Sequence, residues 1–404
     1  MRLSTANLYD ASIANLQRRQ QTLQTQQQQL TSGKRIAQAS DDPTGAARAE
    51  RALASIGRVD ANQRALEASR NSMTLAESAL GDANELMQQA RETMVSAGNA
   101  SYSDAERQGL ANKLQGIRTQ LLAIANRPDG AGGYIFSGQG SANPPFLDQA
   151  GGVAYVGVAG NIQTGNLDSF QLTVDGRGAW EQARSGNGSF VTDANPNSID
   201  PTQPAKGWID AGRVTDPAAL TGQNYRIDIA GTAPAQTYSV TNTDTGAGVA
   251  GGAYKAGQSI AFDGLSVAVA GTPADGDNFS VAPATNSLKV FDVLDRAIGE
   301  LNTPLRNGAQ IQQSNSGRIR DMDAVMGNLQ NARSEVGEKL NNLDGTETRL
   351  AALKQYSTEE KSAAEDLDMT QGISDFQSQQ VGYDTALKTY ALVQRMSLFQ
   401  YING

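Results

Sequence analysis

The sequence predicts a mainly helical fold with an inserted β region, in which helices from the two ends of the chain pair in coiled-coil bundles. Long heptad stripes flank a middle section that is rich in glycine and in short β-prone runs. Two more stripes lie at the termini. Their apolar positions are Tyr9, Ile13, Leu16, Leu23 and Leu30 near the start, and Ile373, Phe376, Tyr383, Leu387 and Tyr390 near the end.

The two terminal stripes are too polar to form stable helices in isolation. Gln20, Gln27 and Gln380 occupy stripe positions, and a half-polar heptad helix needs a partner in water. Both segments are also poor in charged residues, so each helix can pack on neighbours all round without burying charge. We therefore expect residues 1–40 and 367–404 to be mobile in the monomer, to fold together on assembly, and to use the ten apolar residues as an assembly interface.

Residues 41–136 and 287–366 are predicted to form a helical rod domain. Asp42 suits an N-cap, Pro43 the first helical position, and Gly33 the stop of the preceding helix. Further stops are expected at Gly98-Asn99 and at Asn126-Arg127-Pro128. Large and small residues alternate along the stripe after Pro43, which permits close helix approach. The predicted rod core is Leu66, Met73, Leu80, Met87, Met94, Leu114, Ile117, Leu121, Met326, Leu329, Val336, Leu340 and Leu343.

Residues 137–286 are predicted to be an inserted β-rich outer domain, in one or two subdomains. Asp263-Gly264 between two β-prone runs is a strong signal for a two-residue hairpin. Pro196, Pro201 and Pro204 mark a loop or an internal boundary. The expected strands are Tyr225 to Ile229, Thr237 to Val240, Ser259 to Phe262, Leu265 to Ala270 and Phe279 to Val281.

Composition argues against most catalytic chemistry. The 404 residues include no cysteine and no histidine, so thiol chemistry, a histidine base and histidine or cysteine metal ligands are absent. The net charge of −9 argues against a nucleic-acid partner. We find no secretory signal and no apolar segment long enough to span a membrane, which leaves a cytosolic protein or one exported without a cleaved signal. We expect no enzyme activity, no cofactor and no metal.

Three motifs have both a functional and a structural interpretation, and the structural one is favoured for each. Asp275-Gly276-Asp277-Asn278 is similar to part of a calcium loop, but Ala282 stands where the bidentate glutamate is required. Gly138-Gln139-Gly140 lacks the context of a dinucleotide loop. A glycosidase pair would need two of Asp168, Asp175 and Glu181 to come together, and nothing in the sequence places them so.

Several motifs resemble the flagellin superfamily, and most closely its hook-associated junction proteins. Residues Leu30 to Ile36 resemble the N-terminal signature of the superfamily. Residues Ala39 to Pro43 with Ala46-Ala47-Arg48, residues Gly133 to Gly138 with Pro145-Phe146, and residues Ser397 to Ile402 resemble the junction proteins more than flagellin. The resemblance covers residues 1–146 and 287–404, whereas the β region varies within the family.

The resemblance implies a structural adapter at the hook–filament junction of the extracellular bacterial flagellum. The terminal helices would form an inner tube domain, and the chain would leave the cell unfolded through the flagellar type III apparatus. Implied partners are neighbouring copies in a ring, hook-associated protein type 1, flagellin, and a cytosolic export chaperone at the C-terminal helix. Two alternatives remain: a flagellin that forms the filament itself, and a surface glycan-binding or glycan-cleaving protein on a coiled stalk.

Overall fold

The computed structural model describes residues 5–165, 168–194 and 206–402, with the side chains of the terminal helices described from Asp10 onward and as far as Leu392. The chain divides into two compact units. The first consists of Met1–Arg64 and Thr346–Gly404, and the second is Ala65–Gly345. Pro196, Pro201 and Pro204, which the sequence marks as a loop or boundary, lie outside the described residues.

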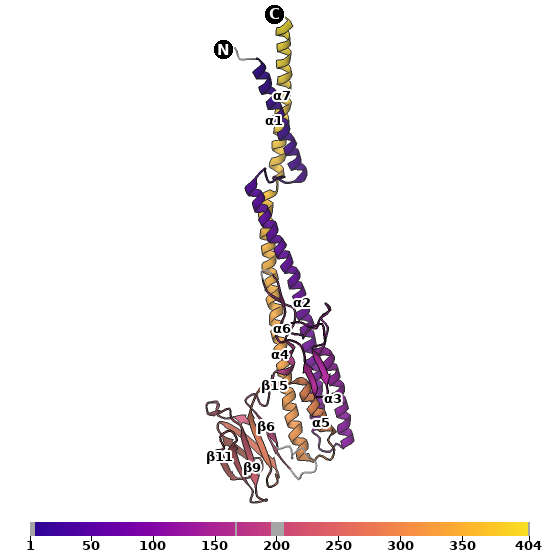
Figure 1. Ribbon diagram of the computed structural model, residues 1–404, viewed down its shortest axis with the longest axis vertical. Helices are drawn as coiled ribbons and strands as arrows, with labels where there is room; N and C mark the ends of the chain where they lie inside the picture. The colour runs from indigo at the N-terminus through magenta and orange to yellow at the C-terminus, as the bar shows by residue number, and fades with distance from the viewer. Residues whose placement is uncertain (1–4, 166–167, 195–205, 403–404) are drawn as a thin grey trace. The chain divides into compact units, whose positions relative to one another are not determined.

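Helices from both ends of the chain form the first unit. Helices α1 (Thr5–Ser32) and α7 (Met369–Ile402) lie side by side, and the start of α1 and the end of α7 lie at the same end of the pair (Figure 1). The first turns of α2 (Pro43–Ala97) pair with the last turns of α6 (Gly308–Glu365). There Lys354 Nζ lies 2.8 Å from Asp60 Oδ1, and Ser357 and Ser55 join their hydroxyls at 3.0 Å.

The predicted helix breaks are confirmed. Helix α1 ends at Ser32, and Gly33 follows it with a φ of 70°, a left-handed value that glycine adopts without strain. Helix α2 begins at Pro43, where Asp42 Oδ1 accepts a hydrogen bond of 2.9 Å from Gly45 N. Helix α2 ends at Ala97, and α3 (Asp104–Ala125) ends just before Asn126.

A helical bundle forms the base of the second unit. It contains the rest of α2, α3, α5 (Val290–Asn302) and the first part of α6. A capping box joins Ser103 to Glu106 at the start of α3 and holds the pKa of Glu106 below its usual value, chiefly through the Ser103 N–H. The structure buries Leu66, Met73, Leu80, Met87, Met94, Leu114, Ile117, Leu121, Leu329, Val336 and Leu343, and half-buries Met326 and Leu340.

Ion pairs fix the register of α2 against α6. Arg91 Nε lies 2.5 Å from Asp323 Oδ1, and Arg333 Nη2 lies 2.5 Å from Glu77 Oε1. Arg333 interrupts the apolar stripe of α6. Its ion pair with Glu77 explains why a charged residue is found at this heptad position. Because these pairs are solvated, we expect them to set alignment more than stability.

Small β elements and a short helix pack directly on the helical bundle. An aromatic cluster joins them to α5: the rings of Trp180 and Phe291 stack at 5.8 Å, and Phe136 and Phe146 meet Trp180 edge-on. The elements are β1 (Phe146–Gln149), β2 (Gly152–Tyr155), β3 (Gln163–Thr164), β4 (Phe170–Gln171), α4 (Gly176–Glu181), β5 (Ala183–Arg184) and β15 (Asn286–Leu288).

A buried arginine joins the β1–β2 hairpin to the helices. The guanidinium of Arg118, on α3, donates to both oxygens of Asp148 on β1, at 2.7 and 2.8 Å, and to Asp295 on α5. These bonds hold the pKa of Asp148 below its usual value. One cation therefore links three elements that are distant in sequence.

The remaining strands form a β sandwich with a core of its own. One sheet has the order β11-β10-β9-β14-β6, and the other has β12-β13-β7 with β8 on β13. The strands are β6 (Phe190–Ala194), β7 (Gly207–Ile209), β8 (Arg213–Val214), β9 (Tyr225–Ala230), β10 (Thr237–Asn242), β11 (Gly248–Ala253), β12 (Ser259–Phe262), β13 (Leu265–Gly271) and β14 (Asn278–Pro283).

The five predicted strands are all present in the sandwich. The Asp263-Gly264 turn joins β12 to β13 as predicted, with Phe262 paired to Leu265 and positive φ at both turn residues. Residues 137–286 nevertheless fall into two parts. Residues 190–194 and 206–283 supply the sandwich core, whereas Phe146, Val153, Trp180 and Ala183 belong to the core of the helical bundle.

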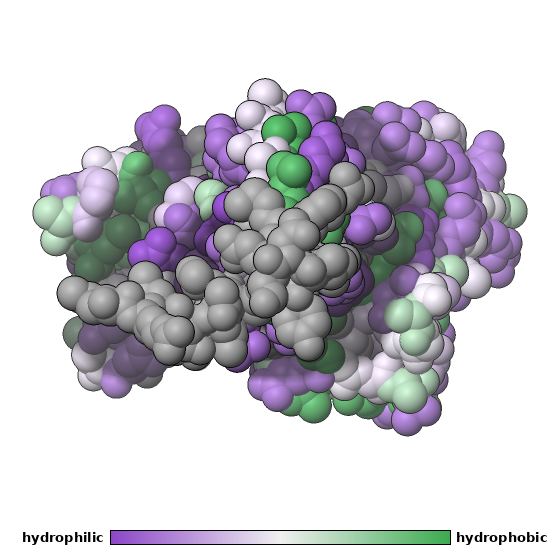
Figure 2. All heavy atoms as spheres, turned by 90° about the horizontal axis from the view of Figure 1, so that it is seen from above, coloured by the Kyte–Doolittle hydropathy of each residue, from purple (hydrophilic) through white to green (hydrophobic). Residues whose placement is uncertain are grey.

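The visible surface is predominantly polar. Figure 2 shows mainly hydrophilic residues on the coloured part of one face, with apolar residues scattered among them. Isolated apolar residues are normal on a protein surface. Within the described part of the chain, no helix combines the length and apolarity that crossing a membrane requires.

Candidate assembly interface

The pairing of α1 with α7 uses three leucines from one helix and three aromatic residues from the other. These side chains are half-buried: Leu16, Leu23, Leu30, Phe376, Tyr383 and Tyr390. Glycines allow the two helices to approach closely. A Cβ on Gly372 would lie 3.2 Å from Leu30 Cδ2, and one on Gly382 would lie 2.7 Å from Arg19 Nη1. We call this contact the α1–α7 seam.

The seam does not use the other residues of the predicted stripes. Ile13, Gln20 and Gln27 on α1 are exposed, and so are Ile373, Gln380 and Leu387 on α7. Between the leucines the half-buried positions are instead Arg19, Gln26 and Gln29. Between the aromatic residues they are Gln379, Gly382 and Ala386. Each stripe is therefore split: its seven-residue repeats point into the seam and its remaining members face outward.

The outward positions form exposed apolar surface. Ile13 is 40% exposed, Ile373 46% and Leu387 41%. Val381 and Leu392 on α7 are also exposed. Among the described side chains of α1 and α7, none is buried. The side chain of Tyr9, the remaining residue of the predicted interface, lies outside the described part of the chain.

The seam is also incompletely packed. A cavity of about 400 Å³ lies between the helices and is lined by Leu16 and Arg19 from one side and by Gly382, Ala386 and Tyr390 from the other. Its remaining lining is hydroxyl and amide groups, at Ser12, Asn15, Thr385 and Thr389. Such a polar, loosely packed contact stabilises a helix pair less than an apolar heptad seam would.

Backbone hydrogen bonds join the two helix turns at the base of the seam. Arg35 N donates to Glu365 O at 2.7 Å, and Leu367 N donates to Gly33 O at 2.9 Å. Lys34 Nζ lies 3.3 Å from Glu365 Oε1. Arg35 donates to the main-chain oxygen of Ala364. We call this set of contacts the base clip.

The Ser-Asp-Asp-Pro segment organises the base clip. Asp41 Oδ2 accepts the N–H groups of Ala37 and Gln38, at 3.1 and 2.8 Å. Asp42 caps α2 and also accepts from the Arg35 guanidinium at 3.1 Å. Hydrogen bonds from Gly45 N and Thr44, together with Arg35, lower the pKa of Asp42 to about 2. Both carboxylates therefore have structural partners.

Two of the three carboxylates considered for catalysis have structural roles. Asp175 is the N-cap of α4 and accepts from Arg177 N and Gly178 N, and Glu181 pairs with Lys289. In the Asp275–Asn278 turn, Asp275 accepts from Gly231 N and Asp277 from Ala274 N. Within the described residues, no group of acidic side chains is arranged to hold a metal ion.

Comparisons with known proteins agree with this geometry. The model of the bacterial flagellin N-terminal helical region matches residues 3–141, and the D2-like domain of flagellar hook-associated protein 1 matches residues 202–283. Flagellar hook-associated protein 3 of Escherichia coli is 25% identical over 412 aligned positions, covering 99% of both chains. A flagellin of Salmonella moscow is 26% identical over 337 positions, covering 77% of this chain and 64% of its own length.

Solved structures of hook-associated protein 3 from other bacteria are also similar to this chain. Hook-associated protein 3 of Legionella pneumophila has a TM-score of 0.70 and 26% identity, covering 77% of this chain and 97% of its own. FlgL of Xanthomonas campestris has a TM-score of 0.66 and 27% identity, with coverages of 76% and 99%. The paired terminal helices, the helical bundle and the near full-length similarity together show that this chain belongs to the flagellin family, on the branch of flagellar hook-associated protein 3 (FlgL), and is a structural component rather than an enzyme.

Proposed function

We propose that this protein forms the hook–filament junction by axial self-assembly, between hook-associated protein type 1 on one side and flagellin on the other. The observation that carries the proposal is the outward apolar surface of α1 and α7, at Ile13, Ile373 and Leu387. The near full-length similarity to hook-associated protein 3 supports the position in the flagellum.

The energetics favour burial of this surface in an assembly. Fully burying a leucine or isoleucine side chain contributes roughly 1.5–3 kcal/mol, and each of these residues is already partly covered. About 1 kcal/mol for each exposed or half-buried apolar residue gives on the order of 5–10 kcal/mol per copy, before the entropy of association is subtracted. That is enough for a repeated contact in a ring, where each copy touches several neighbours.

The proposal assigns a role to each part of the chain. Residues 1–40 and 367–404 form the inner tube, residues 41–136 and 287–366 the surrounding rod, and the β region the outer surface. An export chaperone binds the apolar face of α7 before secretion, which keeps that helix from aggregating in the cytosol. The chain then reaches the extracellular flagellum by the flagellar type III route without a cleaved signal.

A flagellin is the second candidate. The sequence identity of this chain to a flagellin is 26% over 337 positions, close to the 25% identity to hook-associated protein 3 over the full length. Seeded assembly separates the two functions. A flagellin grows long filaments from seeds, whereas a junction protein stops after a thin zone. Long filaments of this chain alone would therefore reject the junction role.

Single substitutions on α7 test the assembly surface. Leu387→Lys places an ammonium group on the outward face, whereas Tyr390→Lys places one in the α1–α7 seam. In cells that lack the endogenous protein, we expect Leu387→Lys to abolish swimming and release flagellin into the medium. Leu387→Met keeps apolar volume and should swim normally.

Export has to be measured in the same cells, by the amount of each variant outside them. If Leu387→Lys is exported at the wild-type level and supports swimming without leaked flagellin, the outward face of α7 is solvent-exposed in the flagellum and the proposal fails. Loss of export with this variant would instead assign the face to the chaperone. The swimming and export of Tyr390→Lys test separately whether the α1–α7 seam is needed.

A further inference from the structure

A cluster of buried charges lies where the β sandwich meets the helical bundle. It surrounds a cavity of about 390 Å³ between β6, α5 and α6. Thr192 and Asp193 line the cavity from the sandwich, Glu300 from α5, and Gln313, Arg318 and Arg320 from α6. The assembly surface on α1 and α7 does not include any of these residues.

Arginine is the dominant buried charge of the cluster. Arg306 is 7% exposed and Arg318 8%. Arg320 is half-buried, with a side chain that is 16% exposed, and burial lowers its pKa and that of Arg306. The buried carboxylates are Glu300 and Asp321, and burial raises the pKa of both. The other charges near the cavity, on Asp193 and Arg296, are exposed to water.

The carboxylates do not satisfy these arginines. Arg318 Nη1 lies 3.2 Å from Asp321 Oδ2 and Arg318 Nε 3.6 Å from Glu300 Oε1, but neither contact has hydrogen-bond geometry. Within the described part of the chain, Nε of Arg306, Arg318 and Arg320 and Nη1 of Arg318 are buried without a hydrogen-bond acceptor. Burying a charged donor without an acceptor costs more than burying a neutral one, on the order of several kcal/mol.

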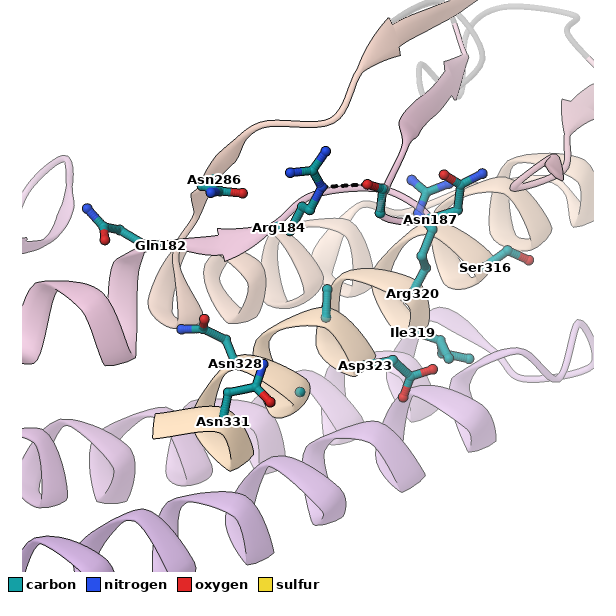
Figure 3. Close-up of a pocket in the computed structure, with 14 residues that line it drawn as sticks. Gln182, Arg184, Asn187, Asn286, Ser316, Ile319, Arg320, Asp323, Asn328 and Asn331 are labelled. Atoms are coloured by element: carbon teal, nitrogen blue, oxygen red, sulfur yellow. Dashed lines mark hydrogen bonds between the residues drawn. The ribbon is translucent and has the colours of Figure 1, made fainter. Parts of the chain in front are cut away.

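Arg320 connects this cluster to the sandwich. It donates to Thr192 Oγ1 at 3.1 Å and to Thr192 O at 3.3 Å, and Ile209 N donates to Gln313 Oε1 at 2.8 Å. Arg320 also lines a neighbouring polar groove of about 630 Å³. Figure 3 shows it extending from α6 toward the loop that carries Asn187. The sandwich therefore contacts the helices through polar groups, beside a cavity where guanidinium N–H groups of Arg318 and Arg320 lack a hydrogen-bond acceptor.

We propose that this cavity is a binding site for a small tetrahedral oxyanion of the phosphate or sulfate type, held by Arg318 and Arg320. Guanidinium groups match the oxygens of such anions with paired, charge-assisted hydrogen bonds. The bound anion supplies the acceptors that Glu300 and Asp321 do not, and it joins α6 to β6 through Arg320. Asp193 and Glu300 border the same cavity and repel an anion, so we expect a dissociation constant in the millimolar range.

The test uses the full chain and inorganic phosphate, titrated at constant ionic strength with potassium chloride and followed by calorimetry and by thermal unfolding. We expect one saturable site and, at ten times the dissociation constant, a rise in Tm of about 3–5 °C. Arg318→Gln should weaken phosphate binding at least tenfold. The matched control Arg213→Gln removes an exposed arginine from β8 and should bind as the wild type does.

Arg320→Lys keeps the positive charge but loses the planar fork, so it should weaken binding several-fold while the circular dichroism spectrum stays unchanged. The proposal is overturned if the wild-type chain binds phosphate no more than it binds chloride. It is also overturned if a folded Arg318→Gln or Arg320→Lys variant retains wild-type affinity. The wild-type titration alone decides the question if Arg318→Gln does not fold.

Discussion

Replacing Leu80 by aspartate is a direct test of the helical bundle of the second unit. Leu80 is 0% exposed and lies in the same cluster as Met73 and Met87, one heptad away on either side along α2. Leu75 on the same helix is 39% exposed. The two leucines thus offer the same substitution in the same helix at a buried and at an exposed position.

The magnitude follows from burial. Truncation of a fully buried leucine to alanine costs about 3–5 kcal/mol, from lost transfer free energy and the cavity that remains. Aspartate adds the desolvation of a carboxylate, a further several kcal/mol, or the cost of protonating it. Since 1 kcal/mol shifts the Tm of a unit of this size by about 2–4 °C, Leu80→Ala should lower the Tm by about 6–20 °C. Leu80→Asp should lower it further.

Circular dichroism at 222 nm is the appropriate assay, because the bundle is helical and the sandwich contributes little to that signal. Leu75→Asp should melt within about 2 °C of the wild type, as surface substitutions usually do. Leu80→Asp should lose the cooperative helical transition or show it at a much lower temperature. If Leu80→Asp and Leu75→Asp melt within about 2 °C of each other, Leu80 is not a core residue and the packing described here is wrong.

Two other predictions concern the β region and the cap of α2. Deleting residues 190–283 with a short Gly/Ser bridge should leave the bundle folded, because Ala284 N donates to Ser189 O at 3.0 Å and the two ends are therefore adjacent. Deleting residues 140–284 should destabilise the bundle, because it removes Phe146 and Trp180 from its core. Equal melting temperatures of the two deletion variants would contradict this prediction. The pKa of Asp42 is about 2 in the folded protein, below the value of about 4 for an unfolded aspartate. The charged cap therefore stabilises α2 fully above about pH 4, and this stabilisation is lost as the pH falls toward 2. Asp42→Asn keeps a cap and should flatten the dependence of Gly45 amide protection on pH between 5 and 2, which hydrogen exchange can measure.

The helix boundaries could be predicted because local residues determine them. A glycine with positive φ, an aspartate cap and a proline at the first helical position act within one turn, so Gly33, Asp42 and Pro43 are informative without knowledge of the fold. The Asp263-Gly264 hairpin is predictable for the same reason. Strand β11 was missed because its sequence Gly-Val-Ala-Gly-Gly-Ala has low β propensity and pairs with β10 only in the folded sheet.

Non-local contacts explain the remaining differences. Trp180 and Phe146 lie in a glycine-rich region that looks like part of the insertion, yet their rings pack on Phe291 of the bundle. The bonds from Arg118 to Asp148 and Asp295 have no sequence signature at all. At the α1–α7 seam, leucine spacing identified the correct seven-residue repeat, but the assignment of the second position to Gln20 and Gln27 was wrong. The structure exposes both and half-buries Arg19 and Gln26 instead, a one-residue shift that the run of glutamines hides.

The contrast between the base clip and the α1–α7 seam bears on the proposed export and assembly of this chain. The clip ties residues 33–35 to residues 364–367 through main-chain hydrogen bonds, while the seam beyond it is half-buried, polar and hollowed by a cavity. A fully apolar seam would close each monomer on itself and compete with neighbouring copies for the same surface. A weak seam that is held at one end keeps α1 and α7 adjacent and aligned. A neighbouring copy then packs on two helices that are already ordered, which lowers the entropic cost of association.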